Sequence, residues 1–109
     1  MSFEIFTIPP FDKQLKALSK MYSSIKRDYD ELLTELETDP LIGVAIGNQC
    51  RKLRMKISSK NKGKSGGGRV IAYVAISKNS VYLLAIYDKS EKETVSEKEI
   101  SALLKFIED

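Results

Sequence analysis

The first forty residues show two hydrophobic periods in succession. Residues 3–8 alternate apolar and polar side chains, which predicts a short strand, and Pro9-Pro10 stops it because proline cannot donate a ladder hydrogen bond. Apolar side chains then recur every three or four positions, which is typical of an amphipathic helix. They are Phe11, Leu15, Leu18, Tyr22, Ile25, Tyr29, Leu32 and Leu36. Because serine competes for the backbone, we predict a helical hairpin that breaks at Tyr22-Ser23-Ser24 and ends at Asp39-Pro40.

The rest of the chain predicts three strands and a helix. Residues 51–57 alternate apolar and basic side chains, as in a half-buried strand. The apolar runs 69–77 and 81–87 are joined by a short turn, which indicates an antiparallel hairpin. Ser96 and Glu99 have the spacing of a capping box at the start of the last helix.

These elements predict an α+β fold in the order β-α-α-β-β-β-α. We expect a mostly antiparallel sheet packed against an N-terminal helical hairpin and a C-terminal helix. The chain has 109 residues, of which 42% are hydrophobic and 30% charged. This length and composition predict a single domain over residues 1–109.

The composition predicts the cellular compartment and excludes some kinds of catalytic and metal site. No apolar run is long enough to span a membrane, and the N-terminus lacks the features of a signal peptide. The single cysteine, Cys50, agrees with a reducing environment, so we expect a cytoplasmic protein with no membrane partner. Without histidine, a histidine triad and a histidine-ligated metal site are excluded, and one cysteine excludes a zinc cluster within one chain. We therefore expect no metal and no cofactor.

The basic residues are concentrated in one window. The chain has 18 basic and 15 acidic residues, and eight of the basic ones lie between Cys50 and Arg69, where no acid occurs. They are Arg51, Lys52, Arg54, Lys56, Lys60, Lys62, Lys64 and Arg69. The remainder of the chain is net negative. Such a patch is typical of phosphate binding, and nucleic acid is the commonest polyphosphate partner.

The strand over residues 51–57 carries the strongest local signal. Lys52, Arg54 and Lys56 share its solvent face, where their like charges repel one another, so a negative partner is expected. A solvated sheet face, or an edge strand protected by lysine, would give the same alternation. The number of basic residues in the window favours phosphate binding.

Three further features have both a structural and a functional interpretation. The Lys/Gly/Ser loop over residues 58–68 is not a nucleotide-binding P-loop, because Ser59 stands where the first glycine is required, but it suits wrapping around RNA or DNA. Arg69 is either an exposed strand end or a planar fork that donates to one phosphate. Tyr87 is either a half-buried core residue or a group that stacks on a base or carries a proton. Cys50 is expected to be a small buried hydrophobe.

Three segments resemble the RelE/HigB family of prokaryotic toxin–antitoxin toxins, which belongs to the RelE/ParE superfamily. The resemblance covers nearly the whole chain and is greatest for the HigB-like branch. The segments are Cys50-Arg51-Lys52-Leu53-Arg54, Lys62-Gly63-Lys64-Ser65-Gly66-Gly67-Gly68-Arg69-Val70-Ile71 and Tyr82-Leu83-Leu84-Ala85-Ile86-Tyr87-Asp88-Lys89-Ser90-Glu91.

The resemblance implies a RelE-like fold and a ribosome-dependent endoribonuclease that cuts mRNA in the ribosomal A site without a metal. The 2′-hydroxyl attacks the adjacent phosphate and the 5′-oxygen leaves. By position, Arg69 would stabilise the phosphorane. Lys52, Arg54 and Lys56 would hold the RNA backbone, and Lys52 or Lys56 could act as base because neighbouring cations lower proton affinity. The remaining catalytic candidates are Tyr87 and Lys89, and the remaining candidates for binding RNA or the ribosome are Arg51, Lys60, Lys62 and Lys64.

The resemblance also implies partners and leaves alternatives open. The expected partners are a cognate antitoxin, the mRNA and ribosome, and a higher-order toxin–antitoxin complex that binds operator DNA. The assignment of acid and base stays open. One alternative function is a ParE-like inhibitor of DNA gyrase without nuclease chemistry, and another is a plain nucleic-acid-binding module. The basic strand with Arg69 and Tyr87 favours the nuclease.

Overall fold

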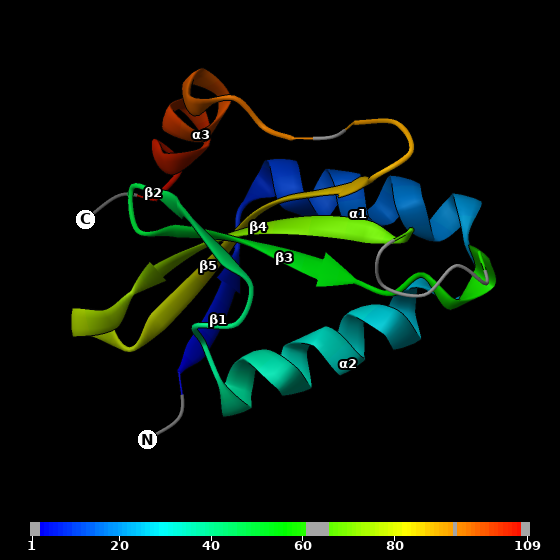
Figure 1. Cartoon of the computed structure of the whole chain (residues 1–109), viewed down its shortest axis with the longest axis horizontal. Helices are drawn as coiled ribbons and strands as arrows, with labels where there is room; N and C mark the ends of the chain where they lie inside the picture. The colour runs from blue at the N-terminus through cyan, green and yellow to red at the C-terminus, as the bar shows by residue number, and fades with distance from the viewer. Residues whose placement is uncertain (1–2, 61–65, 93, 108–109) are drawn as a thin grey trace.

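A five-stranded sheet forms the centre of the molecule (Figure 1). The computed structural model describes residues 3–60, 66–92 and 94–107. The elements are β1 (Glu4–Thr7), α1 (Pro9–Met21), α2 (Ile25–Thr38), β2 (Val44–Gly47), β3 (Cys50–Met55), η1 (Ser58–Lys60), β4 (Gly68–Ala75), η2 (Ile76–Lys78), β5 (Ser80–Asp88) and α3 (Glu97–Leu104). The strand order is β1-β5-β4-β3-β2, with β1 parallel to β5 and the other neighbours antiparallel. The predicted α+β class and mostly antiparallel sheet are confirmed.

The helices begin and end where the local sequence dictates. Pro9 and Pro10 end the first strand and also occupy the first turn of α1, where an N–H group would have no helical partner anyway. Tyr22 caps the end of α1 and Ser24 precedes α2, so the predicted break in the hairpin is confirmed. At α3, Ser96 and Glu99 form the predicted capping box, with Glu99 N–H donating to Ser96 Oγ at 3.1 Å.

The sequence prediction missed β2. This strand has four residues, mostly exposed, and shows no alternation of polar and apolar side chains. It joins β3 through Asn48 and Gln49, which both have positive φ angles, 53° and 61°. Two positive φ values are typical of the tight turn whose twist suits a hairpin, but glutamine gives no sequence signal for that conformation.

The strand predicted over residues 51–57 runs from Cys50 to Met55, so Lys56 lies beyond its end and is not part of the cationic strand face predicted for it. Two further predicted boundaries were wrong for identifiable reasons. The strand predicted over residues 69–77 ends at Ala75, because 76–78 form the η2 turn and Asn79 adopts a left-handed conformation with φ of 50°. The loop predicted over residues 58–68 contains η1 at its start, and its last residue, Gly68, already belongs to β4.

Cross-strand pairing assigns the side chains of the sheet to two faces. Leu53, Val70 and Ile86 are partners across β3, β4 and β5, and all three are buried in the hydrophobic core. The core also contains Phe11 of α1 and Leu32 of α2. In Figure 1, α1 lies behind β4 and β5, and α2 runs along the lower side of the sheet.

Adjacent residues along a strand point to opposite faces, so the next row, in which Arg69 pairs with Arg54 and Tyr87, points to the other face of the sheet. No helix among the described residues is long and apolar enough to cross a membrane.

Candidate nucleic-acid interface

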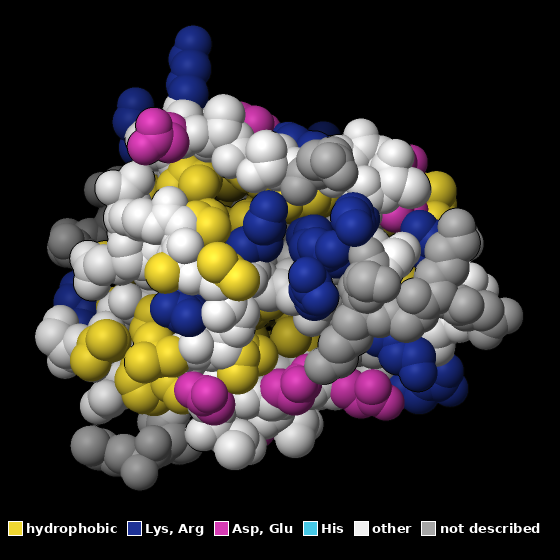
Figure 2. All heavy atoms as spheres, viewed as in Figure 1, with side chains coloured by type: hydrophobic (Ala, Val, Ile, Leu, Met, Phe, Trp, Pro, Cys, Tyr) yellow, Lys and Arg dark blue, Asp and Glu magenta, His cyan; other side chains and the backbone are white. Residues whose placement is uncertain are grey.

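Four predicted site residues from three separate segments line one groove. Lys52 and Arg54 come from β3, Arg69 from β4, and Lys89 follows β5. We call this site the basic groove. It has a volume of about 480 Å³, and its remaining lining residues are Glu35, Ile42, Gly43, Val44 and Leu53. Figure 2 shows Lys and Arg side chains gathered over the middle of this face, with acidic side chains along its lower edge.

The register of the sheet explains why these cations meet. Arg54 pairs with Arg69 across β3 and β4, and Arg69 pairs with Tyr87 across β4 and β5. Partners in an antiparallel ladder project from the same face, so the three side chains form one row. Lys52 stands two residues before Arg54 on the same face. The predicted cationic face is therefore confirmed for Lys52 and Arg54 of β3, and it is joined to residues from two other strands.

Arg69 is the most enclosed of these cations. Its exposed fraction is 6%, and its Nη1 donates to the carbonyl oxygen of Gly68 at 2.9 Å. Arg69 is not an exposed strand end, which was the structural alternative considered for it. A guanidinium held on a strand and bordering a groove has the geometry to donate in a planar fork to a phosphate.

Tyr87 is the cross-strand partner of Arg69, but it does not line the basic groove and instead borders a neighbouring cavity with Val95 and Glu99. Its exposed fraction is 8%, and its hydroxyl has no hydrogen-bond partner in the part of the chain that the structure describes. Burial raises the pKa of Tyr87 above its ordinary value; Arg69 acts in the opposite direction and Glu99 adds to the increase. The hydroxyl therefore keeps its proton at neutral pH.

Other predicted residues lie outside the basic groove. Lys56 follows the end of β3 and is exposed. Arg51 donates from Nε to the carbonyl oxygen of Ile42 and from Nη2 to that of Gly43, both at 2.9 Å, and so holds the segment before β2. Lys62 and Lys64 lie outside the described residues.

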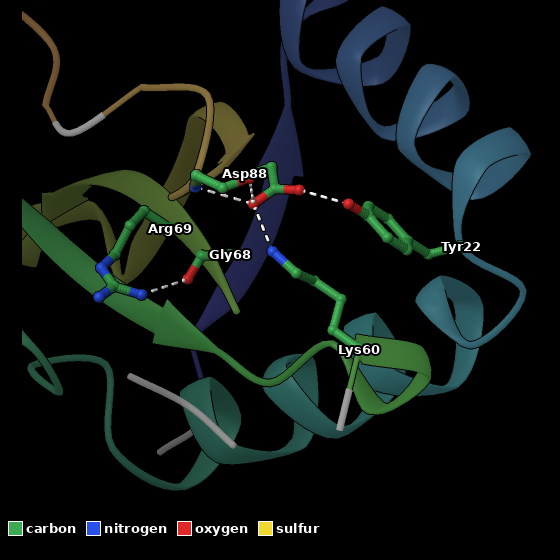
Figure 3. Close-up of polar contacts among 6 residues, drawn as sticks. Tyr22, Lys60, Gly68, Arg69 and Asp88 are labelled. Carbon is green, nitrogen blue, oxygen red and sulfur yellow. Dashed lines mark hydrogen bonds and ion pairs between the residues drawn. The ribbon is translucent and has the colours of Figure 1, made fainter. Parts of the chain in front are cut away.

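Lys60 belongs to a cluster centred on Asp88. Lys60 Nζ lies 2.8 Å from Asp88 Oδ1, the Tyr22 hydroxyl donates to Oδ2 at 2.5 Å, and the Ser90 N–H and Oγ donate to Oδ1 at 2.9 and 2.8 Å. We call these four residues the Asp88 cluster (Figure 3). Burial raises the pKa of Asp88, but the hydrogen bonds from Lys60, Tyr22 and Ser90 outweigh it and hold the pKa well below its ordinary value.

A second buried carboxylate holds the neighbouring turn. Asp28 of α2 accepts hydrogen bonds from Ser24 Oγ at 2.6 Å and from Ser58 Oγ and N–H at 2.6 and 2.9 Å. Burial raises the pKa of Asp28, but the hydrogen bonds from Ser24 and Ser58 outweigh this effect, so the pKa lies below its ordinary value. Asp28 thereby fixes η1 to the start of α2.

Sequence reasoning did not identify Glu35, Asp28 or Asp88 as important. Glu35 is one of several acids on the polar face of a helix, and only the packing of α2 beside β3 brings it to the basic groove. The two buried aspartates gave a weak signal, since each stands near serines that can donate to it. The interpretation of Cys50 as a buried hydrophobe is confirmed, because it is 1% exposed and burial raises its thiol pKa to about 11.

The element order and sheet order define a RelE-like fold. An arginine-to-alanine double mutant of E. coli toxin RelE in the free state matches with a TM-score of 0.62 and 18% identity, covering 99% of this chain and 100% of that chain. The isolated E. coli RelE toxin matches with a TM-score of 0.56 and 17% identity, over 97% of this chain and 100% of that one.

A third structure, the double mutant in complex with a RelBc antitoxin peptide, matches with a TM-score of 0.57 and 18% identity, again over 99% and 100% of the two chains. No family model matches the chain. At this level of identity the likeness establishes the fold, and the residues of the groove must be argued from their own geometry.

Proposed function

We propose that this protein is the toxin of a type II toxin–antitoxin pair and acts as a metal-independent, ribosome-dependent mRNA endoribonuclease. The observation that carries the proposal is the convergence of Lys52, Arg54, Arg69 and Lys89 on one groove of a RelE-like fold. Several cations in a groove beside a buried tyrosine suit a reaction in which negative charge increases on a phosphate.

The reaction requires two proton transfers and charge stabilisation. The 2′-oxygen forms a bond to the adjacent phosphorus as the bond from phosphorus to the 5′-oxygen breaks, which leaves a 2′,3′-cyclic phosphate and a 5′-hydroxyl. A base takes the 2′ proton, and an acid gives a proton to the leaving oxygen. Arg69 and Arg54 are proposed to hold the phosphate oxygens and stabilise the phosphorane.

The environment of Tyr87 favours the role of acid over that of base. A hydroxyl with a raised pKa is protonated at neutral pH and has a proton to give. Lys52 and Lys89 border the basic groove and are the proposed candidates for the base, and Lys56, one residue beyond the end of β3, is a further candidate.

The proposed partners follow from the same surface. A ribosome would position the mRNA in the basic groove, and this alignment would lower the entropic cost of the reaction. The RelE structure with a bound antitoxin peptide supports the proposal that a cognate antitoxin neutralises this chain as well, by covering the groove. A complex of toxin and antitoxin that binds operator DNA belongs to the same proposal.

Primer extension on a reporter mRNA in a reconstituted translation reaction tests this function. We expect cuts within codons only when ribosomes are translating, and loss of those cuts in Arg69→Ala, because the phosphorane loses its main cation. Lys13→Ala is the matched control, since Lys13 is an exposed cation on α1 outside the groove. Both variants must give the far-UV spectrum and cooperative unfolding of the wild type.

A folded, toxic wild type that cuts no mRNA would contradict the nuclease. Inhibition of DNA gyrase by that same protein would then favour the ParE-like alternative, and salt-sensitive RNA binding without cleavage would favour a binding module.

A further inference from the structure

The Asp88 cluster lies directly beside three of the proposed catalytic residues. Asp88 is the last residue of β5, between Tyr87 and Lys89 in the chain, and it pairs across the sheet with Gly68, the neighbour of Arg69. Adjacent residues on a strand point to opposite faces. The Asp88 carboxylate therefore lies on one side of the sheet, and Tyr87 and Arg69 project from the other.

Asp88 joins segments that are far apart in the sequence. Tyr22 follows α1, Lys60 ends η1, and Ser90 follows β5. The backbone reinforces this junction, because Lys89 N–H donates to the carbonyl oxygen of Gly67 at 3.1 Å. The Asp88 carboxylate and this backbone hydrogen bond thus both hold the end of the β4–β5 hairpin.

Lys60 and Asp88 form a largely buried ion pair. The side chains of Asp88 and Lys60 are 1% and 12% exposed. A carboxylate so enclosed stays ionised only when it is paired and hydrogen-bonded. In Figure 3 the guanidinium of Arg69 points away from the Asp88 cluster, and Lys60 is not among the residues that line the basic groove.

We propose that Asp88 is a positioning residue for RNA cleavage. By holding Lys60 and Tyr22, it fixes the end of the hairpin that carries Arg69, Tyr87 and Lys89. This inference rests on the proposed nuclease function and assigns Lys60 to support of the site instead of RNA contact. Small errors in placing a reacting group are costly, since a displacement of about 1 Å can lower a rate by about 100-fold.

Single-turnover cleavage on programmed ribosomes, corrected for the folded fraction, tests the proposal. We compare Asp88→Asn, Lys60→Met and the double variant Lys60→Met/Asp88→Asn. The control is Lys13→Met, which makes the same substitution at an exposed lysine of α1 that lies outside both the basic groove and the Asp88 cluster.

We expect Asp88→Asn to lower the maximal rate by about tenfold or more, while the ribosome concentration at half-maximal rate changes less than about twofold. Lys60→Met should also lower the maximal rate, since it leaves the carboxylate buried without its cation. The double variant should recover much of the rate, because both members of the pair are then neutral.

Two outcomes would overturn the inference. If Lys60→Met raised the half-maximal ribosome concentration and left the maximal rate unchanged, Lys60 would be an RNA contact. If Asp88→Asn cleaved at the wild-type rate per folded molecule, Asp88 would support the fold alone.

Backbone amide NMR spectra separate this inference from the proposed function. Asp88→Asn should shift the amide signals of Gly68, Arg69 and Lys89 and leave those of the β2–β3 turn unchanged, whether or not the protein cuts RNA. Absence of cleavage by the wild type would refute the nuclease, whereas unshifted signals at these three residues would refute the positioning role of Asp88.

Discussion

The buried ring of Tyr87 stabilises the fold, whereas its buried hydroxyl destabilises it. Its ring is buried against the core, and its hydroxyl is buried as well but has no hydrogen-bond partner among the described residues. A buried hydroxyl without a partner loses its hydrogen bonds to water and destabilises the folded state by about 1–3 kcal/mol. Such a cost is typical of a functional site, where a group is held ready for a substrate.

Tyr87→Phe should therefore change stability and activity in opposite directions. We expect the free energy of unfolding to rise by about 1 kcal/mol, because the variant removes only the unpaired hydroxyl. The cleavage rate should fall by about 100-fold, because the proposed acid is lost. Urea denaturation and single-turnover cleavage measure the two quantities.

The matched control is Tyr73→Phe, four residues after Arg69 on the same face of β4. Tyr73 is half-buried and lies outside the basic groove, so this variant should change the cleavage rate by less than about twofold. A loss of stability in Tyr87→Phe would show that the hydroxyl has a stabilising partner and contradict its role as an unused donor.

Among the elements, the approach of β4 to the end of β3 depends on a glycine. A Cβ atom at Gly67 would lie 2.4 Å from the carbonyl oxygen of Met55 and 2.9 Å from the N–H nitrogen of Ile57. Both atoms belong to backbone that cannot move without disturbing the ladder. Gly67 was predicted as part of a flexible loop, yet it lets the two strands come close enough to align Arg54 with Arg69.

Gly67→Ala should lower the free energy of unfolding by about 2 kcal/mol, because the methyl group overpacks against backbone. Gly47→Ala is an informative control, since nothing lies within 4 Å of the added Cβ but φ is +93°. It should cost about 1 kcal/mol from backbone conformation alone. Thermal or urea unfolding measures both, and equal losses would contradict the steric argument.

The sequence predicted the elements that carry a regular pattern. The helix period from Phe11 to Leu36, the alternation around Leu53 and the capping box at Ser96 each appear in the structure. These signals are local, because each depends on residues within one helix or strand. The short strand β2 escaped prediction because its conformation is set by pairing with β3 and by the left-handed pair Asn48 and Gln49.

The site was predictable only in part, for the same reason. Alternation alone places Lys52 and Arg54 on one face. The pairing of Arg54 with Arg69 depends on the strand register. The position of Glu35 in the lining of the basic groove depends on how α2 packs against β3. Lys60 has the same side chain as Lys52, and only the tertiary fold distinguishes a groove cation from the partner of a buried carboxylate.

At the scale of the whole molecule, charge is separated between the sheet and α2. The basic groove crosses the middle of one face, and α2, with five acidic and two basic residues, runs along its lower side. A positive strip beside a negative edge orients an approaching polyanion along the strip. Binding of RNA should therefore depend strongly on salt, and the dependence should come from the groove cations and not from the net charge of +3.

Lys52→Gln tests this separation without requiring catalysis. For single-stranded nucleic acid, each phosphate contact contributes about 0.7 to the slope of log affinity against log salt. We expect the magnitude of the slope to fall by about 0.7 in Lys52→Gln and to stay unchanged in Lys13→Gln, which removes the same charge from the exposed side of α1. Fluorescence anisotropy with a 2′-O-methyl RNA, which lacks the attacking hydroxyl, measures the slope. Equal decreases in the two variants would mean that RNA responds to the overall charge, and the basic groove would then have no special part in binding.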